Sequence, residues 1–221
     1  PLSAAPHSPG NIEPVSTLNG VRVNQVLIGS CTNSSYRDLK IVARILEGQK
    51  VDPEVSLGIA PGSRQVLRML AEEGLLAIMI RAGARILENA CGFCIGNSMA
   101  LVINAVSLRT SNRNFEGRSG TSSARVYLVS PEIAALAAVH GRVVDPLAVA
   151  DLKYPRVREP KVMEVDDSMF IQPPEDGKSV KLVRGPHMGE IPVNEALPKD
   201  LAGVCTIKVG DRITTDHIMP A

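Results

Sequence analysis

The sequence predicts an α/β fold in which helices cover a mostly parallel sheet. Over residues 21–150, short runs rich in β-branched residues alternate with amphipathic stretches, and this alternation is typical of strand–helix–strand units. Hydrophobic residues make up 44% of the 221 residues and charged residues 21%, as in ordinary globular domains. Aromatic residues make up only 3% and Trp is absent, so the core must be built from aliphatic side chains.

The first half of the alternating region predicts two strands, each followed by a helix. Residues 21–29 (VRVNQVLIG) form an apolar run typical of a buried strand. Residues 36–47 carry apolar side chains at helical spacing, and Gly48 ends the predicted helix. Residues 55–60 (VSLGIA) predict the second strand and residues 63–74 the second helix.

The second half predicts three more strands and one more helix. The strands are expected at residues 84–87 (ARIL), 104–109 (NAVSLR) and 125–130 (RVYLVS). Ser130 and Pro131 then form a helix start, with Ser as N-cap and Pro in the first helical position, before EIAALAAVHG.

Changes in composition divide the chain into three predicted segments. Residues 1–150 form the α/β domain. Residues 151–200 contain many of the 16 prolines, and Pro resists both helix and central strand, so we interpret them as an irregular connector. In residues 201–221 an apolar pattern returns, which indicates the start of a further domain. The chain has no initiator Met and stops after TTDHIMPA, and we interpret it as a segment of a longer polypeptide.

Charge and cysteine content exclude several classes of protein. The net charge of +1 gives no reason to expect a polyanion or an anionic membrane as partner. The sequence has no run of 18 apolar residues and no secretory signal, so no membrane span is predicted. Four cysteines are too few for a disulfide-stapled secreted domain, which favours a cytoplasmic location.

Polar clusters follow three of the predicted strands directly. They are SCTNSS (30–35), ENACGFCIGN (88–97) and SNRNFEGR (111–118). The carboxyl ends of parallel strands share one edge of the sheet, so we expect these loops to converge into a single site.

The cysteines of these loops indicate metal or redox chemistry. Cys91 and Cys94 form a Cys-x-x-Cys pair, which suits half a zinc site, a dithiol or part of an iron–sulfur cluster. Cys31 adds a third thiol from a different loop, and three thiolates leave one iron of a four-iron cluster open to act as a Lewis acid. Cys205 is the possible fourth ligand, but its apolar flanks favour a place in the core.

The arginines of the third loop suggest an anionic ligand. Arg113 and Arg118 flank a Gly-containing turn, and guanidinium groups bind carboxylates through paired hydrogen bonds. Two surface arginines are the plain alternative. Arg64 stands at a predicted helix start, where anion binding is conceivable but an ordinary helix start is commoner.

Five segments, in this order and at this spacing, resemble the aconitase superfamily along nearly the whole chain. They are IGSCTNSSYRDL (28–39), APGSRQV (60–66), CGFCIGN (91–97), TSNRNFEGRSG (110–120) and GDRITTDHIMPA (210–221). The resemblance implies a three-layer α/β/α domain that carries the cluster loops, then an interdomain connector, then the first residues of a swivelling domain.

The resemblance also implies roles for individual residues. Cys31, Cys91 and Cys94 would ligate a [4Fe–4S] cluster, although Phe93 stands where typical aconitases have Pro. The substrate carboxylates would be bound by Arg113 and Arg118, with Asn112 in the same site, and Asp216 would support the active-site network. The catalytic base would lie outside this chain, so the chain alone is expected to be inactive, with an oxygen-labile cluster.

The family reaction is dehydration and rehydration of a hydroxy carboxylic acid. Because the chain runs on into TTDHIMPA, the resemblance favours aconitate hydratase, which converts citrate and isocitrate through cis-aconitate in the tricarboxylic acid cycle. Homoaconitase or a 3-isopropylmalate dehydratase type of hydro-lyase is the alternative. The expected partners are a small tricarboxylate and the remaining domains of the parent polypeptide, with no membrane.

Two functions of other classes remain open from the sequence. Some aconitase-like proteins bind RNA, but this chain has neither a basic stripe nor a set of stacking aromatic residues. A zinc-binding structural module would need a fourth ligand, for which only Cys205 or a distant His is available.

Overall fold

The computed structural model describes residues 1–30, 33–150, 153–160, 162, 165–181, 183–190, 192–213 and 215–218. The chain divides into two units, Pro1–Val165 and Asp166–Ala221. The segment boundaries expected from the sequence, at residues 150 and 200, remain a prediction.

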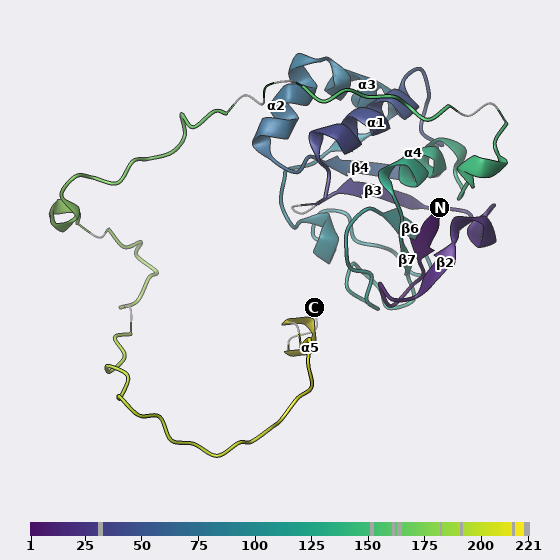
Figure 1. The fold of residues 1–221 in the computed structure, drawn as a ribbon. Helices are drawn as coiled ribbons and strands as arrows, with labels where there is room; N and C mark the ends of the chain where they lie inside the picture. The colour runs from purple at the N-terminus through teal and green to yellow at the C-terminus, as the bar shows by residue number, and fades with distance from the viewer. Residues whose placement is uncertain are drawn as a thin grey trace. The chain divides into compact units, whose positions relative to one another are not determined.

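The first unit contains a seven-stranded sheet in the order β2-β1-β7-β6-β3-β4-β5 (Figure 1). The five strands from β7 to β5 pair in parallel, and β1 pairs antiparallel with both β2 and β7. This confirms the predicted α/β fold with a mostly parallel sheet. The strands are β1 (Leu2–Ala4), β2 (Ile12–Pro14), β3 (Gln25–Gly29), β4 (Ser56–Ala60), β5 (Arg85–Ile86), β6 (Val106–Arg109) and β7 (Arg125–Leu128).

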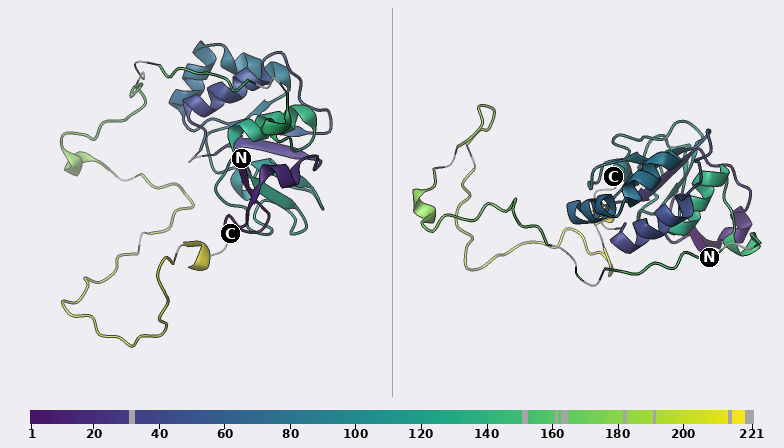
Figure 2. Two further views of the ribbon diagram at one scale, coloured as in Figure 1. Left: turned by 45° about the vertical axis from the view of Figure 1, so that its right-hand side comes forward. Right: turned by 90° about the horizontal axis from the view of Figure 1, so that it is seen from above.

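Four helices of this unit lie together on one side of the sheet (Figures 1 and 2). α1 contacts the other three helices, and α4 packs on β3 and β6. Alternate strand residues such as Val26, Ile28 and Leu108 are fully or almost fully buried in the core beneath these helices. The helices are α1 (Tyr36–Leu46), α2 (Arg64–Glu72), α3 (Leu75–Ala82) and α4 (Pro131–His140).

Loops cover the opposite face of the sheet. Leu27, which alternates with its neighbours in β3, packs there with Phe93 and Met99 from the loop between β5 and β6. A second small cluster joins Leu101 to Val126 of β7. In the part of the chain that the structure describes, the layer on this face therefore consists of loops and one 3-10 turn, η2 (Phe93–Ile95).

The strand order fixes the position of the loops that carry the predicted site. From β3 the sheet continues through β4 to β5 on one side and through β6 to β7 on the other. The chain crosses from one half to the other between β5 and β6, so the strand order switches next to β3. Open α/β sheets bind ligands at the carboxyl edge beside such a switch. The loops after β3, β5 and β6 all begin at this edge.

The second unit has little regular structure among its described residues. It contains a 3-10 turn, η4 (Gly177–Ser179), and the short helix α5 (Thr215–Ile218). The strand-like pattern after residue 201 forms no strand in the described range 201–213. Cys205 is exposed, so the expectation that it packs in a core is wrong for this unit, where neighbouring apolar side chains such as Val204 are exposed as well.

Within the described ranges, no helix is both long enough and apolar enough to span a membrane.

Candidate functional site

The Cys94 thiol is held in a tight turn after β5. The Asn97 N–H donates to the carbonyl of Gly92 at 2.9 Å, and the Gly96 N–H donates to the carbonyl of Phe93 at 3.1 Å. Cys94 is only 8% exposed. The turn therefore fixes this sulfur at the carboxyl edge of the sheet, as the spacing after the predicted strand suggests.

Of the other two predicted thiol ligands, only one lies within the described residues. Cys91 lies three residues earlier in the same loop and is exposed. Cys31 lies outside the described residues, two positions after the end of β3. Within the described ranges no group of three His, Cys, Asp or Glu side chains is placed to hold a metal ion. The three-thiolate ligand set therefore stays a prediction.

Gly96 brings the cysteine turn against the loop that follows β6. It adopts a left-handed conformation with φ of 79°, and a Cβ atom on it would lie 2.9 Å from the Ser119 carbonyl carbon. The Ser119 hydroxyl donates to the Cys94 carbonyl at 3.2 Å. The two loops are in direct contact here, which only a residue without a side chain permits.

Substituting Gly96 by Ala should therefore cost more stability than a left-handed backbone alone. Gly48 is a matched control, because its φ is 74° but nothing lies within 4 Å of its Cβ position. We expect Gly48→Ala to lower the free energy of unfolding by about 1–2 kcal/mol, and Gly96→Ala to cost roughly 1–3 kcal/mol more through the steric clash. Urea unfolding of both variants measures the difference, and equal losses would contradict the close packing of the two loops.

Arg118 lies beside the Cys94 sulfur. Its Nη2 is 3.8 Å from Cys94 Sγ, within reach of a weak charge-assisted hydrogen bond. Its Nε and the Ser111 hydroxyl oxygen are buried and have no hydrogen-bond partner among the described residues. Since buried polar groups are normally satisfied, the Arg118 Nε is a donor that is available to a polar ligand.

The neighbouring polar residues of the loop after β6 differ in their exposure. Arg113 is half-buried and Asn112 is exposed. Asn114 is 1% exposed, and its Nδ2 donates to the carbonyls of Ala5 at 2.6 Å and Val126 at 3.1 Å. Asn114 thus fastens the loop to the sheet edge, a structural role inside the motif that sequence reasoning missed.

A second residue that sequence reasoning missed is Arg109, the last residue of β6. Its side chain is fully buried, and its Nη1 donates to the Phe93 carbonyl at 2.8 Å. Burial, together with the nearby Arg118 charge, lowers the pKa of Arg109 to about 10, while Cys94 acts in the opposite direction. Arg109 thus stays protonated at neutral pH. Its only signal in the sequence is a charged residue within the apolar run NAVSLR.

Of two other residues singled out in the sequence, one is exposed at the start of a helix and the other has a side chain outside the described part of the structure. Arg64 is exposed at the first position of α2. Asp216 belongs to α5 in the second unit, and its side chain is outside the described part of the chain. The structure therefore brings together Cys94 and Arg118, and adds Arg109 and Ser119 to them.

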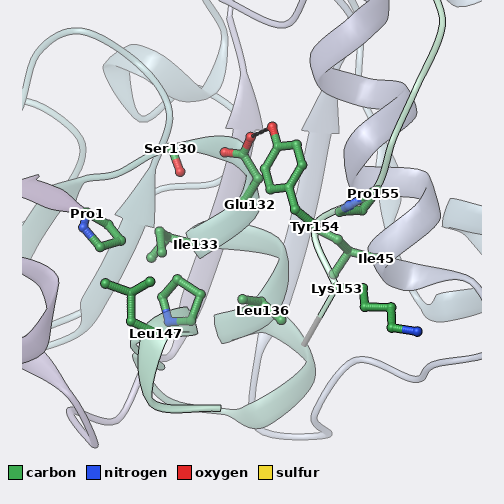
Figure 3. Close-up of a pocket in the computed structure, with 11 residues that line it drawn as sticks. Pro1, Ile45, Ser130, Glu132, Ile133, Leu136, Leu147, Lys153, Tyr154 and Pro155 are labelled. Atoms are coloured by element: carbon green, nitrogen blue, oxygen red, sulfur yellow. Dashed lines mark hydrogen bonds between the residues drawn. The ribbon is translucent and has the colours of Figure 1, made fainter. Parts of the chain in front are cut away.

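A separate apolar cavity of about 370 Å³ lies beside α4 (Figure 3). Its lining includes Ile45, Ile133 and Leu136, and none of the predicted site residues. Tyr154 Oη donates to a carboxylate oxygen of Glu132 at 2.6 Å at its rim, and this bond is the main cause of a raised pKa of Tyr154. The cavity and the cysteine turn are therefore distinct features of the first unit.

Comparison with known proteins shows a matching family model and similar relatives. The model of the aconitase family (aconitate hydratase) matches residues 4–141. The chain is 46% identical over 147 residues to the 3-isopropylmalate dehydratase large subunit 1 of Archaeoglobus fulgidus, covering 66% of this chain and 35% of the relative. It is 44% identical over 158 residues to the 3-isopropylmalate dehydratase large subunit of a Sulfurihydrogenibium species, covering 71% and 36%.

A third relative carries a different name. The methanogen homoaconitase large subunit of Methanocaldococcus jannaschii is 41% identical over 145 residues, which cover 65% of this chain and 34% of the relative. The matched part of the chain thus spans about a third of the length of these curated relatives.

Proposed function

The chain belongs to the aconitase family, and from this premise we propose that it forms the cluster-binding part of a hydro-lyase acting on a hydroxy carboxylic acid. The observation that carries the proposal is the Arg118 guanidinium beside the Cys94 thiol, with a buried Nε that has no partner among the described residues. A thiol ligand and an anion-binding group in contact at one sheet edge suit a metal-bound carboxylate substrate.

The names of the relatives support a substrate other than the one the resemblance favours. The relatives described above are named for 3-isopropylmalate dehydratase or homoaconitase. The expected aconitate hydratase activity, and with it a place in the tricarboxylic acid cycle, has no specific support from them. We therefore propose 3-isopropylmalate as the substrate class, and a homoaconitase type of reaction as the second candidate.

The residues around the cysteine turn fit an iron–sulfur cluster, which members of this family generally carry. The charges of Arg109 and Arg118 lie next to the turn, and cationic surroundings favour thiolate over thiol and stabilise an anionic metal–thiolate group. We propose Cys31, Cys91 and Cys94 as the three ligands. When bound, the cluster supplies an open iron that acts as a Lewis acid toward the substrate hydroxyl.

The chain's own part in the reaction is to bind and orient the substrate. We propose that Arg118 binds a substrate carboxylate through its unsatisfied N–H, together with Arg113 and Asn112, which follow β6 in the same loop. Fixing the carboxylates holds the reacting carbon in register and lowers the entropic part of the barrier. We propose Asp216 as a supporting residue and place the base that removes the proton outside this chain.

Completion of the site requires further polypeptide. The relatives are named as large subunits, and we propose that this chain likewise works with a second subunit or with further domains. A cytoplasmic location stays a prediction from the cysteine content.

The substrate is tested by assaying a polypeptide that spans the full length of the relatives, combined with the second subunit or further domains that complete the site and reconstituted anaerobically with iron and sulfide. We expect 3-isopropylmalate to be dehydrated fastest, as followed by the ultraviolet absorbance of the unsaturated acid. Faster conversion of citrate would restore the aconitate hydratase function, and no conversion of any of these acids would contradict a hydro-lyase. The 221-residue chain assayed alongside should show no turnover.

A further inference from the structure

Arg109 is a buried cation that has no carboxylate partner among the described residues. It is the last residue of β6, which pairs with the central strand β3, and its side chain has no exposed surface. Besides the Phe93 carbonyl, it donates from Nε to the Ser107 hydroxyl at 3.1 Å and from Nη2 to Gln25 Oε1 at 3.1 Å. All three acceptors are neutral groups.

The positive charge of Arg109 is therefore not balanced by any ion pair found in the described residues. The ion pairs Lys40–Glu73, Arg44–Glu47 and Arg68–Glu72 lie on or near the helices and do not involve Arg109. Burying a charge without a counter-charge is strongly unfavourable. Such an arrangement persists when an anion compensates it, and Cys94 is a candidate, because it lies in the turn to which Arg109 is bonded and interacts with it electrostatically.

We propose that Arg109 is a positioning residue for the cysteine turn and the buried counter-charge of the metal–thiolate group that this turn would hold. Its bond to the Phe93 carbonyl fixes the residue that immediately precedes Cys94, and its guanidinium interacts electrostatically with Cys94, so a permanent positive charge lies near the sulfur. The counter-charge role of Arg109 rests on the proposed function. Its positioning role does not, because Arg109 is bonded to the cysteine turn whether or not a metal group is bound.

This role explains why an arginine, and no smaller polar residue, stands at the end of β6. Serine or glutamine at this position would satisfy one or two neutral acceptors and leave the negative charge of the thiolates uncompensated. The planar guanidinium instead donates in three directions at once and stays charged when buried. Net charge and hydrogen bonding around the ligand sulfurs are among the factors that set the reduction potential of an iron–sulfur cluster.

The test compares Arg109→Met and Arg109→Lys with the unaltered 221-residue chain. Met keeps the approximate length of the side chain but removes the charge and the donors, whereas Lys keeps the charge. Arg125→Met is the matched control, because Arg125 is an exposed arginine on the adjacent strand β7. Circular dichroism establishes that each variant folds, and if Arg109→Met does not, Arg109→Lys carries the comparison.

The first measurement is hydrogen exchange in the metal-free chain. We expect Arg109→Met to raise the exchange rates of the Gly96 and Asn97 amides, whose bonds close the turn, by tenfold or more. Arg109→Lys should raise them less, and Arg125→Met should leave them unchanged. Unchanged protection of the turn in both Arg109 variants would overturn the positioning role.

The second measurement is the reduction potential after anaerobic reconstitution with iron and sulfide. We expect a more negative potential for Arg109→Met and nearly the original potential for Arg109→Lys, since the conservative variant restores the charge. Equal potentials for all chains would overturn the counter-charge role. If the unaltered chain binds no iron and sulfide, the proposed function fails together with the counter-charge role, and hydrogen exchange still decides the positioning role.

Discussion

Cys94→Ser should abolish stable binding of iron and sulfide by this chain. A serine hydroxyl is not deprotonated near neutral pH, whereas a thiol in cationic surroundings provides a thiolate. Serine is close to cysteine in size, so the tight turn around position 94 should persist and the loss should be specific. The measurement is iron and sulfide content per chain after anaerobic reconstitution, with Cys31→Ser and Cys91→Ser expected to show the same loss.

Cys205→Ser is the matched control for this series. Cys205 is exposed in the second unit, where its sulfur contacts the Ile207 carbonyl at 3.5 Å. We expect its replacement to leave the iron content unchanged. An equal loss from Cys205→Ser would overturn the three-ligand assignment, and full iron uptake by Cys94→Ser would remove Cys94 from the ligand set.

Arg118→Lys should reduce kcat/KM far more than it reduces stability. Lysine keeps the positive charge but loses the planar pair of donors that binds a carboxylate. One charge-assisted hydrogen bond is worth roughly 1.5–3 kcal/mol, which corresponds to a loss of about 10- to 150-fold in kcat/KM. The side chain is only half-buried, so the free energy of unfolding should change little.

The kcat/KM measurement uses a polypeptide with the full length of the relatives, combined with the second subunit or further domains that complete the site, and 3-isopropylmalate as substrate. Arg125→Lys, at an exposed residue of β7, should leave kcat/KM unchanged. If Arg118→Lys has no effect on kcat/KM with any of the acids tested, Arg118 does not bind the substrate.

The parallel part of the sheet was predictable because its strands are short apolar runs bounded by Gly and polar residues. β3 to β7 all lie inside the predicted ranges. The antiparallel strands β1 and β2 were not predicted, since each has only three residues and gives no alternating pattern. α3 was missed because LLAIMIRA is apolar almost throughout, so it lacks the polar face that reveals a surface helix.

The site was predictable only at the level of its loops. Loops that follow parallel strands meet at one edge of the sheet, and on this ground Cys94 and Arg118 were expected to lie close together. The structure confirms this contact. The roles of Asn114 and Arg109 depend on contacts with residues distant in the sequence, such as Ala5 and Phe93. Such contacts leave no local pattern. Cys205 was misjudged because its apolar flanks indicate burial only where a unit has a core to receive them.

Metal and sulfide analysis of the anaerobically reconstituted chain tests the central claim most directly. The three thiolates that we propose as ligands, with the buried Arg109 and the half-buried Arg118 beside the cysteine turn, predict a four-iron cluster. The account therefore predicts iron and inorganic sulfide in equal amounts, about four of each per chain, and no bound zinc. Stoichiometric zinc without sulfide would contradict it and would identify the cysteine turn as part of a structural zinc site.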